Sequence, residues 1–280
     1  MTNPSWKFLP VPTWNKTFSK ATNDFNVVLD FIRVRVQDAI KQIEETGYSE
    51  TDQDKSVLEK MITRNGKDSL IPLVTAIDLI AAGIDTTGNS LGHVLYHLST
   101  NPESQEKLRQ ECQNLGSHLT IKDLDKMKYT KACIQESMRL TPTTSAMVRV
   151  LPNDIELRGH HIPSGTMMIW QHSIINYDER FFSNAEKYIP ERWIENKRQI
   201  HPFAYRPFSH GPRMCIGKRF AELELQVALH NIISNFEIEW MNSQPLTIHQ
   251  ELINVRMQDP CKISFEVLNN THLFFIISGT

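Results

Sequence analysis

The chain of 280 residues is 40% hydrophobic, so it can bury a sizeable core as one large domain or as two smaller ones. Its 30 basic and 32 acidic residues leave a net charge of -2. Such a nearly equal number of opposite charges creates no overall electrostatic field that would attract nucleic acid or an anionic membrane. We therefore expect no nucleic-acid partner.

The N-terminal stretch MTNPSWKFLPVPTWNK has proline and tryptophan where a signal peptide has its apolar centre. No apolar run in the sequence reaches the roughly 20 residues that cross a membrane. We therefore expect neither a signal peptide nor a membrane span in this chain.

Helices are predicted along the first half of the chain. Apolar residues recur every three or four positions over residues 18–45, as on an amphipathic helix. A second helix is predicted over residues 70–98, and its first half, LIPLVTAIDLIAAGI, is apolar nearly all round. We expect that half to be buried. A third helix should follow Asn101-Pro102 and run through Cys112, and a fourth should extend over residues 127–140.

Strands are predicted in two places. Residues 148–170 alternate β-branched and polar side chains between turn-forming Pro, Asn and Gly residues, which indicates a small sheet. Irregular, proline-rich chain follows up to Pro212, and a last helix is predicted over residues 216–236. Strand-like FEIEW and CKISFEV segments come after it. The predicted fold class is therefore mostly α with a small β portion.

The four cysteines lie far apart without a C-x-x-C pair, which favours a reducing compartment. Cys215 follows turn-forming residues and precedes a predicted helix, whose free N–H groups favour a thiolate. Such a thiolate can be a nucleophile, a redox thiol or a metal ligand, and a buried structural cysteine is an equal alternative. A nucleophile would need a nearby base, for which His210 is the only local candidate. Taken alone, these residues leave the choice open.

His93 and His97 have the i, i+4 spacing of a zinc-binding helix. Val94 stands where the H-E-x-x-H motif needs its glutamate, and the sequence offers no evident third ligand. We therefore interpret both histidines as packing residues of their helix.

The order F-x-x-G-x-R-x-C-x-G, formed by Phe208, Gly211, Arg213, Cys215 and Gly217, resembles the haem-binding loop of the cytochrome P-450 haem-thiolate monooxygenases. The resemblance implies that Cys215 is the metal ligand, the axial thiolate of haem b (iron protoporphyrin IX), whose electron donation favours O–O cleavage. It also implies that Arg213 pairs with a haem propionate. The implied fold is the C-terminal half of the cytochrome P-450 fold, mostly α with a small β portion.

The segment AGIDTT, residues 82–87, resembles the oxygen-activating segment of this family. By that resemblance Asp85 and Thr86 are catalytic and manage proton delivery, while Ala82 and Gly83 leave room for oxygen over the haem. A carboxylate and a hydroxyl in a buried apolar stretch are costly unless they have partners or a function. An ordinary polar pair on a helix is the alternative.

Four more positions match family landmarks. Glu136 and Arg139 have the i, i+3 spacing of an ordinary surface ion pair. The resemblance instead implies that they join Arg192, in the segment PERW, as a structural network behind the haem. Arg149, in MVRV, matches a second propionate-binding arginine, with a surface strand arginine as the alternative.

CIGKRFAELELQ, together with AGIDTT, looks most like the mitochondrial-type branch, whose members receive electrons from a small acidic ferredoxin. That resemblance implies a basic docking face, for which Lys131, Lys218 and Arg219 are candidates; ordinary solvated charges are the alternative. It also implies the matrix side of the mitochondrial inner membrane. A flavoprotein reductase and the endoplasmic reticulum membrane are the alternative donor and location. Membrane association would come only from apolar surface or from family segments outside this chain.

The resemblance runs from about residue 8 to Val267 and covers the second half of a complete family member. We therefore expect a partial monooxygenase domain over residues 1–267, with the N-terminal half absent, and an atypical C-terminal tail over residues 268–280.

The resemblance implies a haem-dependent monooxygenase that inserts one oxygen atom of O2 into an apolar substrate. Steroids and sterols are the expected substrate class, and an insect ecdysteroid hydroxylase is the narrower hypothesis. By the same resemblance, residues 141–148, TPTTSAMV, are expected to touch the substrate; a plain helix-to-strand connection is the alternative. One alternative is a haem-thiolate isomerase of oxygenated lipids, which would dispense with Asp85 and Thr86. The other is a catalytically inactive fragment that binds haem or serves as an interaction module.

Overall fold

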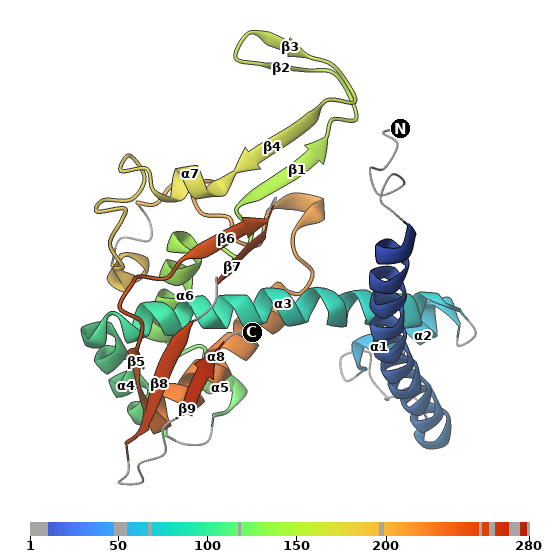
Figure 1. Cartoon of the computed structure of the whole chain (residues 1–280), viewed down its shortest axis with the longest axis horizontal. Coiled ribbons are helices and arrows are strands. Elements are labelled where there is room, and N and C mark those ends of the chain that lie inside the picture. Colours follow the sequence, from blue (N-terminus) through green and yellow to red (C-terminus); the bar gives the residue numbers. More distant parts are fainter. Residues whose placement is uncertain are drawn as a thin grey trace. The chain divides into compact units, whose positions relative to one another are not determined.

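The computed structural model describes residues 11–47, 55–66, 69–116, 119–195, 199–251, 254–257, 261–268 and 275–278. The chain divides into two compact units, Met1–Ala82 and Gly83–Thr280. Helices dominate the described residues and the sheets are small (Figure 1). The predicted fold class, mostly α with a small β portion, is therefore confirmed.

The first unit contains α1 (Val11–Thr46), α2 (Val57–Asn65) and the start of α3 (Ile71–Ser99). A reciprocal capping box starts α2, because the Ser56 hydroxyl accepts a hydrogen bond from the Glu59 amide (3.1 Å) and the Glu59 carboxylate accepts one from the Ser56 amide (2.7 Å). The helix predicted over residues 18–45 is confirmed as α1. The helix α2 was not predicted, since it has only 9 residues.

The helix predicted over residues 70–98 is confirmed as α3, but the expected burial of its first half is wrong. Leu70, Ile71, Val74 and Ile80 are exposed, and Ile84 is 64% exposed. Between residues 70 and 89 only Pro72 is buried, and regular burial sets in from Ser90 onwards. By length and composition α3 could also cross a membrane, contrary to the expectation from the sequence.

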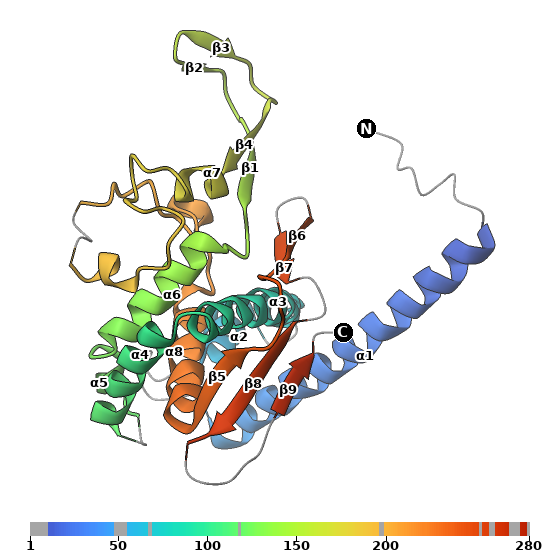
Figure 2. The ribbon, with the colours of Figure 1, turned by 60° about the vertical axis from the view of Figure 1, so that its left-hand side comes forward.

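Three helices enclose the core of the second unit: α4 (Pro102–Leu115), α6 (Lys128–Leu140) and α8 (Lys218–Asn235). They lie side by side in both views (Figures 1 and 2), with the short helix α5 (Ile121–Leu124) between α4 and α6 in sequence. All three helices correspond to predicted ones. Their apolar faces meet the end of α3 and strand residues in one cluster, whose fully buried members include Val94, Leu98, Leu108, Cys133, Leu225, Leu229 and Ile233.

The sheet predicted over residues 148–170 consists of two antiparallel pairs. β1 (Ala146–Val150) pairs with β4 (Met167–Gln171), and β2 (Ile155–Leu157) pairs with β3 (His160–Ile162) at the far end of that ribbon (Figure 1). Together they confirm the predicted sheet. The short helix α7 (His172–Asn176) follows β4 directly.

The strands after α8 form two more antiparallel sheets. β5 (Phe236–Trp240), β8 (Lys262–Val267) and β9 (Phe275–Ser278) lie in the order β5-β8-β9, and β6 (Ile248–Glu251) pairs with β7 (Asn254–Met257). The predicted strands FEIEW and CKISFEV are thus confirmed as β5 and β8. β9 belongs to the segment predicted as an atypical tail, yet it pairs along β8. The domain boundary at residue 267 stays a prediction.

Candidate functional site

The loop around Cys215 is closed by its own backbone. It includes the 3-10 helix η3 (Gly211–Arg213) and ends where α8 begins. The Cys215 amide donates a hydrogen bond to the Phe208 carbonyl (2.9 Å), and the Met214 amide donates one to the Gly211 carbonyl (2.9 Å). Gly211 has φ 75°, a left-handed conformation that glycine adopts without strain. This geometry presents the Cys215 thiol at the surface, whereas the other three cysteines are buried.

The surroundings of the thiol are apolar and open. Met214 and Phe220 are exposed, and Ile216 is 78% exposed, which is unusual for large aliphatic and aromatic side chains. A Cβ added at Gly217 would lie 3.9 Å from the sulfur of Cys215, so glycine keeps this side of the sulfur clear. An exposed sulfur among uncovered apolar side chains fits a flat, apolar, metal-bearing group such as haem, whose iron the Cys215 sulfur would hold.

The two arginines predicted to meet haem propionates differ in setting. Arg213 is exposed, two residues before Cys215, and its charge is therefore available to an anionic group near the loop. Arg149 is half-buried on β1, where its guanidinium donates a hydrogen bond to the Val148 carbonyl (2.7 Å). Both assignments to propionates stay predictions.

Asp85 and Thr86 lie on the exposed part of α3. They were expected in a buried stretch, so the argument from the cost of burial does not apply to them here. The Asn89 side-chain amide donates to the Asp85 carbonyl (2.7 Å), and the Ser90 hydroxyl donates to the Thr86 carbonyl (2.8 Å). A Cβ added at Gly83 would meet nothing within 4 Å, so the helix surface beside these residues is open. Ala82, which precedes Gly83, is also exposed.

The structure brings Glu136, Arg139 and Arg192 together in a buried network. Arg139 donates two hydrogen bonds to the Glu136 carboxylate (2.8 and 3.0 Å), and Arg192 donates one (3.0 Å). The three side chains are at most 6% exposed. The remaining donors of Arg139 reach the backbone carbonyls of Asn176, Ala185 and Lys187. This network holds α6 against the 3-10 helix η2 (Pro190–Trp193).

Sequence reasoning missed two further donors to this carboxylate. The Trp193 indole N–H donates to Glu136 at 2.8 Å, and the Ile189 amide donates at 3.0 Å. Trp193 follows Arg192 in the segment PERW, so its aromatic N–H next to a predicted network residue was the available signal.

Two of the candidate basic residues are paired with nearby carboxylates, and all three remain accessible. Lys131 lies 3.9 Å from Asp125, and Lys218 lies 3.8 Å from Glu222, one helical turn further along α8. The Lys218 ammonium also stands over the Phe208 ring at 5.9 Å. Arg219 is exposed at the start of α8, four residues after Cys215. Lys218 and Arg219 thus place positive charge beside the cysteine loop.

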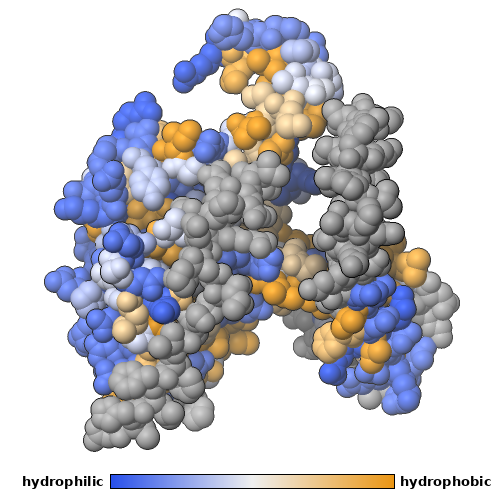
Figure 3. Space-filling model, in the orientation of Figure 1, coloured by the Kyte–Doolittle hydropathy of each residue, from blue (hydrophilic) through white to orange (hydrophobic). Residues whose placement is uncertain are grey.

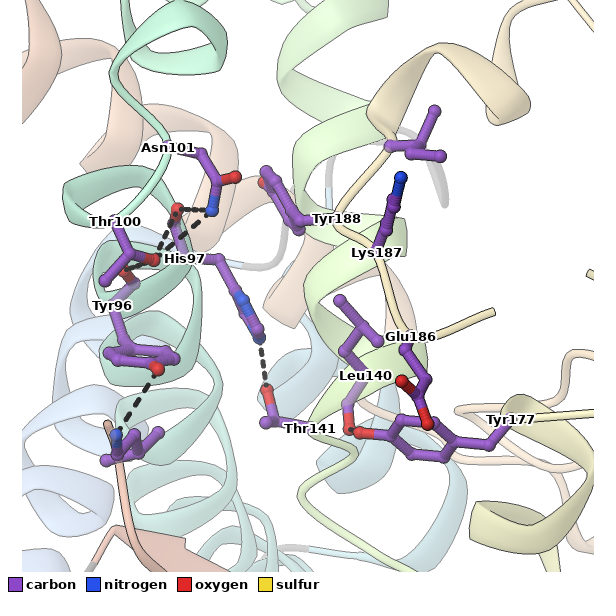
Figure 4. Close-up of a pocket in the computed structure, with 12 residues that line it drawn as sticks. Tyr96, His97, Thr100, Asn101, Leu140, Thr141, Tyr177, Glu186, Lys187 and Tyr188 are labelled. Atoms are coloured by element: carbon purple, nitrogen blue, oxygen red, sulfur yellow. Dashed lines mark hydrogen bonds between the residues drawn. The ribbon is translucent and has the colours of Figure 1, made fainter. Parts of the chain in front are cut away.

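A cleft of about 580 Å³ lies elsewhere in the second unit (Figure 4). It is lined by the end of α3, the end of α6 and residues 186–189, and none of its lining residues belongs to the Cys215 loop. His97 stands at its wall, stacked on Tyr188 at 5.0 Å between ring centroids. We therefore do not assign the expected chemistry to this cleft.

His93 and His97 are both buried. His97 hydrogen-bonds to Thr141 at 3.1 Å, and among the described residues no group of three or more His, Cys, Asp or Glu side chains is placed to hold a metal ion. Their interpretation as packing residues agrees with this burial.

The chain is similar to known proteins over the residues described above. The family model for cytochrome P450 matches residues 1–265. "Probable cytochrome P450 12c1, mitochondrial" of Drosophila melanogaster is 34% identical over 84% of this chain and 46% of its own length. "Cytochrome P450 CYP12A2" of Musca domestica is 32% identical over 95% of this chain and 52% of its own length. "Probable cytochrome P450 12a5, mitochondrial" of Drosophila melanogaster is 31% identical over the same shares.

The chain spans about half the length of the curated relatives it matches. Members of the matched family bind haem b, in agreement with the cofactor expected from the Cys215 loop. The family model reaches into β8 and so includes the cysteine loop, α3 and the Glu136 network. The chain therefore belongs to the cytochrome P450 family, in its mitochondrial-type branch.

Proposed function

We propose that this chain carries the thiolate-ligand half of a haem-dependent monooxygenase, which inserts one oxygen atom of O2 into an apolar substrate. The observation that carries the proposal is the exposed Cys215 thiol, presented by a closed loop among uncovered apolar side chains. Haem, when bound, supplies the oxygen-activating redox chemistry.

The chain's own residues would then bind and orient the cofactor. Cys215, as a thiolate, is the proposed axial ligand, and Met214, Ile216 and Phe220 would be covered by the macrocycle. Covering them removes apolar surface from water, which favours binding by about 25 cal/mol per Å². Arg213 and Arg149 are the proposed partners of the propionates. A cofactor that binds only the folded chain also stabilises it.

Asp85 and Thr86 are the proposed proton-handling pair. Both are exposed on α3, beside Gly83 with its open surface. A carboxyl group can take protons from water and pass them to a hydroxyl, which relays them further, so the pair has the chemistry that a proton pathway needs. The alternative isomerase reaction consumes no protons from solvent and would not use this pair.

The first test is the absorption spectrum of the haem-reconstituted chain, reduced and exposed to carbon monoxide, compared with Cys215→Ala. A thiolate-ligated haem gives a Soret band far to the red of an imidazole-ligated haem. We expect that band in the wild type and in the control Cys261→Ala, and its loss in Cys215→Ala. A red-shifted band that survives in Cys215→Ala would refute the assignment of the ligand.

The proposed electron donor is an acidic ferredoxin that docks beside the cysteine loop. Lys218 and Arg219 lie next to the loop, and Lys131 lies on α6. Attraction between a basic face and an acidic partner speeds association and weakens as salt is added. Lys131→Glu should slow reduction by ferredoxin at low salt and flatten the salt dependence, whereas Lys262→Glu, a charge reversal on β8, should do neither. Equal rates for Lys131→Glu and wild type would exclude this docking residue.

Steroids and sterols are the proposed substrate class, and ecdysteroid hydroxylation is the narrower proposal. The names of the relatives support a mitochondrial location.

The variant Thr86→Ala distinguishes a monooxygenase from an isomerase. In a haem-loaded monooxygenase that turns over, the variant should release more of its oxygen as peroxide. Unchanged turnover without peroxide would instead favour an isomerase.

A further inference from the structure

The short segment between α6 and β1, residues 141–145, is held from two sides. On one side it faces α3, where the Ser90 hydroxyl meets the Thr143 hydroxyl at 2.7 Å. On the other side, the Ser145 carbonyl accepts hydrogen bonds from the amides of His172 (2.8 Å) and Ser173 (3.3 Å). A connection of five residues with contacts on both sides has little freedom of its own.

The polar groups of α3 that face this segment form one stripe. Thr86, Ser90, His93 and His97 are spaced i, i+4, i+7 and i+11, which places them on a single face of a helix. Ser90 and both histidines are buried. His97 bonds to the Thr141 hydroxyl at 3.1 Å (Figure 4), and Thr141 in turn donates to the Ser137 carbonyl at 3.1 Å. The stripe therefore contacts the segment at Thr141, through His97, and at Thr143, through Ser90.

The neighbouring hydrogen bonds determine which hydroxyl donates in the contact between Ser90 and Thr143. A serine hydroxyl has one proton, and the Ser90 proton goes to the Thr86 carbonyl (2.8 Å). The bond between the two hydroxyls must then be donated by Thr143, with the Ser90 oxygen as acceptor. Thr143, Ser90 and the backbone of Thr86 thus form one continuous chain of hydrogen bonds. Ser90 thereby links the segment to the Thr86 turn.

We propose that Ser90 is a positioning residue, whose hydroxyl fixes residues 141–145 relative to the Asp85-Thr86 turn of α3. The proposal deepens the proposed function and rests on it, because residues 141–148 are the stretch expected to touch the substrate and Thr86 is the expected proton donor. Through Ser90 the substrate-facing segment and the proton-handling turn keep one relative placement. Deleting this hydroxyl leaves the Thr143 hydroxyl half-buried without its partner on α3.

The test uses the 280-residue chain without haem and measures amide hydrogen exchange. In Ser90→Ala the amides of residues 143–147 should exchange roughly five- to tenfold faster, the effect of one lost hydrogen bond. Ser90→Thr, which restores a hydroxyl, should return them to the wild-type rate. The control Ser99→Ala removes another buried α3 hydroxyl, whose one partner among the described residues is the carbonyl of Tyr96 in its own helix. This control should leave residues 143–147 unchanged.

Thr143→Val removes the other partner and should speed the same amides, with no further increase in the double variant. Unchanged exchange of residues 143–147 in Ser90→Ala would overturn the proposal, as would an equal increase in Ser99→Ala. These results do not depend on haem, so a failure of haem uptake would count against the proposed function alone.

A second arm uses haem-loaded chain and cholesterol as an apolar probe, followed by the change in the haem absorption band. Ser90→Ala should raise the half-saturating cholesterol concentration several-fold, and Ser90→Thr should restore it. Equal values for wild type and Ser90→Ala would contradict a role in positioning the substrate segment.

Discussion

Glu136 and Arg139 form a two-point ion pair in which neither side chain is exposed to solvent. The carboxylate accepts five hydrogen bonds in all, from Arg139, Arg192, Trp193 and the Ile189 amide. Buried charges are tolerated only when their partners and hydrogen bonds are complete, and this network meets that condition. One carboxylate thereby organises the packing of α6 against residues 189–193.

Glu136→Gln should destabilise the chain strongly. The substitution keeps the shape but removes the negative charge, so the two arginines remain buried without a compensating anion. Breaking a buried pair in this way costs about 3–5 kcal/mol. The free energy of unfolding in urea is the measurement, and Glu156→Gln, the same change at an exposed position on β2, should alter it by less than about 0.5 kcal/mol. Similar values for both variants would show that the network contributes no stability.

Periodicity and turn residues predicted most of the larger elements of this fold. The apolar spacing over residues 18–45 and 216–236 appears as α1 and α8 because each helix packs one face against its unit. For the first half of α3 the helix was predicted correctly, but its burial was not. An all-round apolar sequence indicates burial, yet most of this stretch is exposed or half-buried, because burial depends on contacts with distant elements that a local pattern does not contain.

The sequence motif predicted the candidate site, but it did not predict the hydrogen bonds that support the site. The order of residues 208–217 was enough to single out the cysteine loop. The bond between Thr143 and Ser90 joins positions 53 residues apart, and no local spacing can predict such a contact. Trp193 meets Glu136 across 57 residues, and its place beside Arg192 in PERW was the one sequence signal for this donor.

Ser209→Gly should stabilise the cysteine loop. Ser209 has φ 67°, a left-handed conformation that costs non-glycine residues roughly 1 kcal/mol. Its hydroxyl is buried and has no hydrogen-bond partner among the described residues. Glycine relieves both, so the melting temperature should rise. Ser173→Gly is the matched control, because it places glycine inside the regular helix α7 and should lower the melting temperature. A fall in Ser209→Gly would mean that the serine hydroxyl makes a bond worth more than the strain.

Ile84→Gln should reduce the binding of an apolar dye and the self-association of the chain without lowering its stability. Ile84 is 64% exposed among other uncovered apolar residues of α3. Figure 3 shows further hydrophobic surface along the β1–β4 ribbon, which agrees with exposed Met167, Ile169 and Trp170. Contiguous patches of this kind drive association, whereas single exposed aliphatic residues do not.

The control for that experiment is Ile121→Gln. Ile121 is 85% exposed on α5, so the same change removes a comparable exposed side chain from another element. Dye fluorescence and light scattering should fall in Ile84→Gln and stay at the wild-type level in Ile121→Gln. Equal reductions would mean that total apolar exposure, not the α3 surface, controls association.

Stability should fall as the pH drops from about 6.5 towards 4. Burial lowers the pKa of His93 to about 4, and burial, together with the nearby charges of His93 and Arg139, lowers that of His97 to about 3. Because an unfolded histidine has a pKa of about 6.5, the unfolded chain binds protons in this window that the folded chain does not. Each histidine can then remove up to about 1.4 kcal/mol of unfolding free energy per pH unit.

His97→Gln tests this linkage, because glutamine can retain the hydrogen bond to Thr141 but takes up no proton. The pH dependence of the urea midpoint between pH 7 and pH 4 should be shallower in His97→Gln than in wild type. His161→Gln, at an exposed position on β3, should keep the wild-type slope. The carboxylates titrate in all three proteins, so the comparison isolates the histidine. An unchanged slope in His97→Gln would mean that His97 takes up its proton in the folded chain as readily as in the unfolded one.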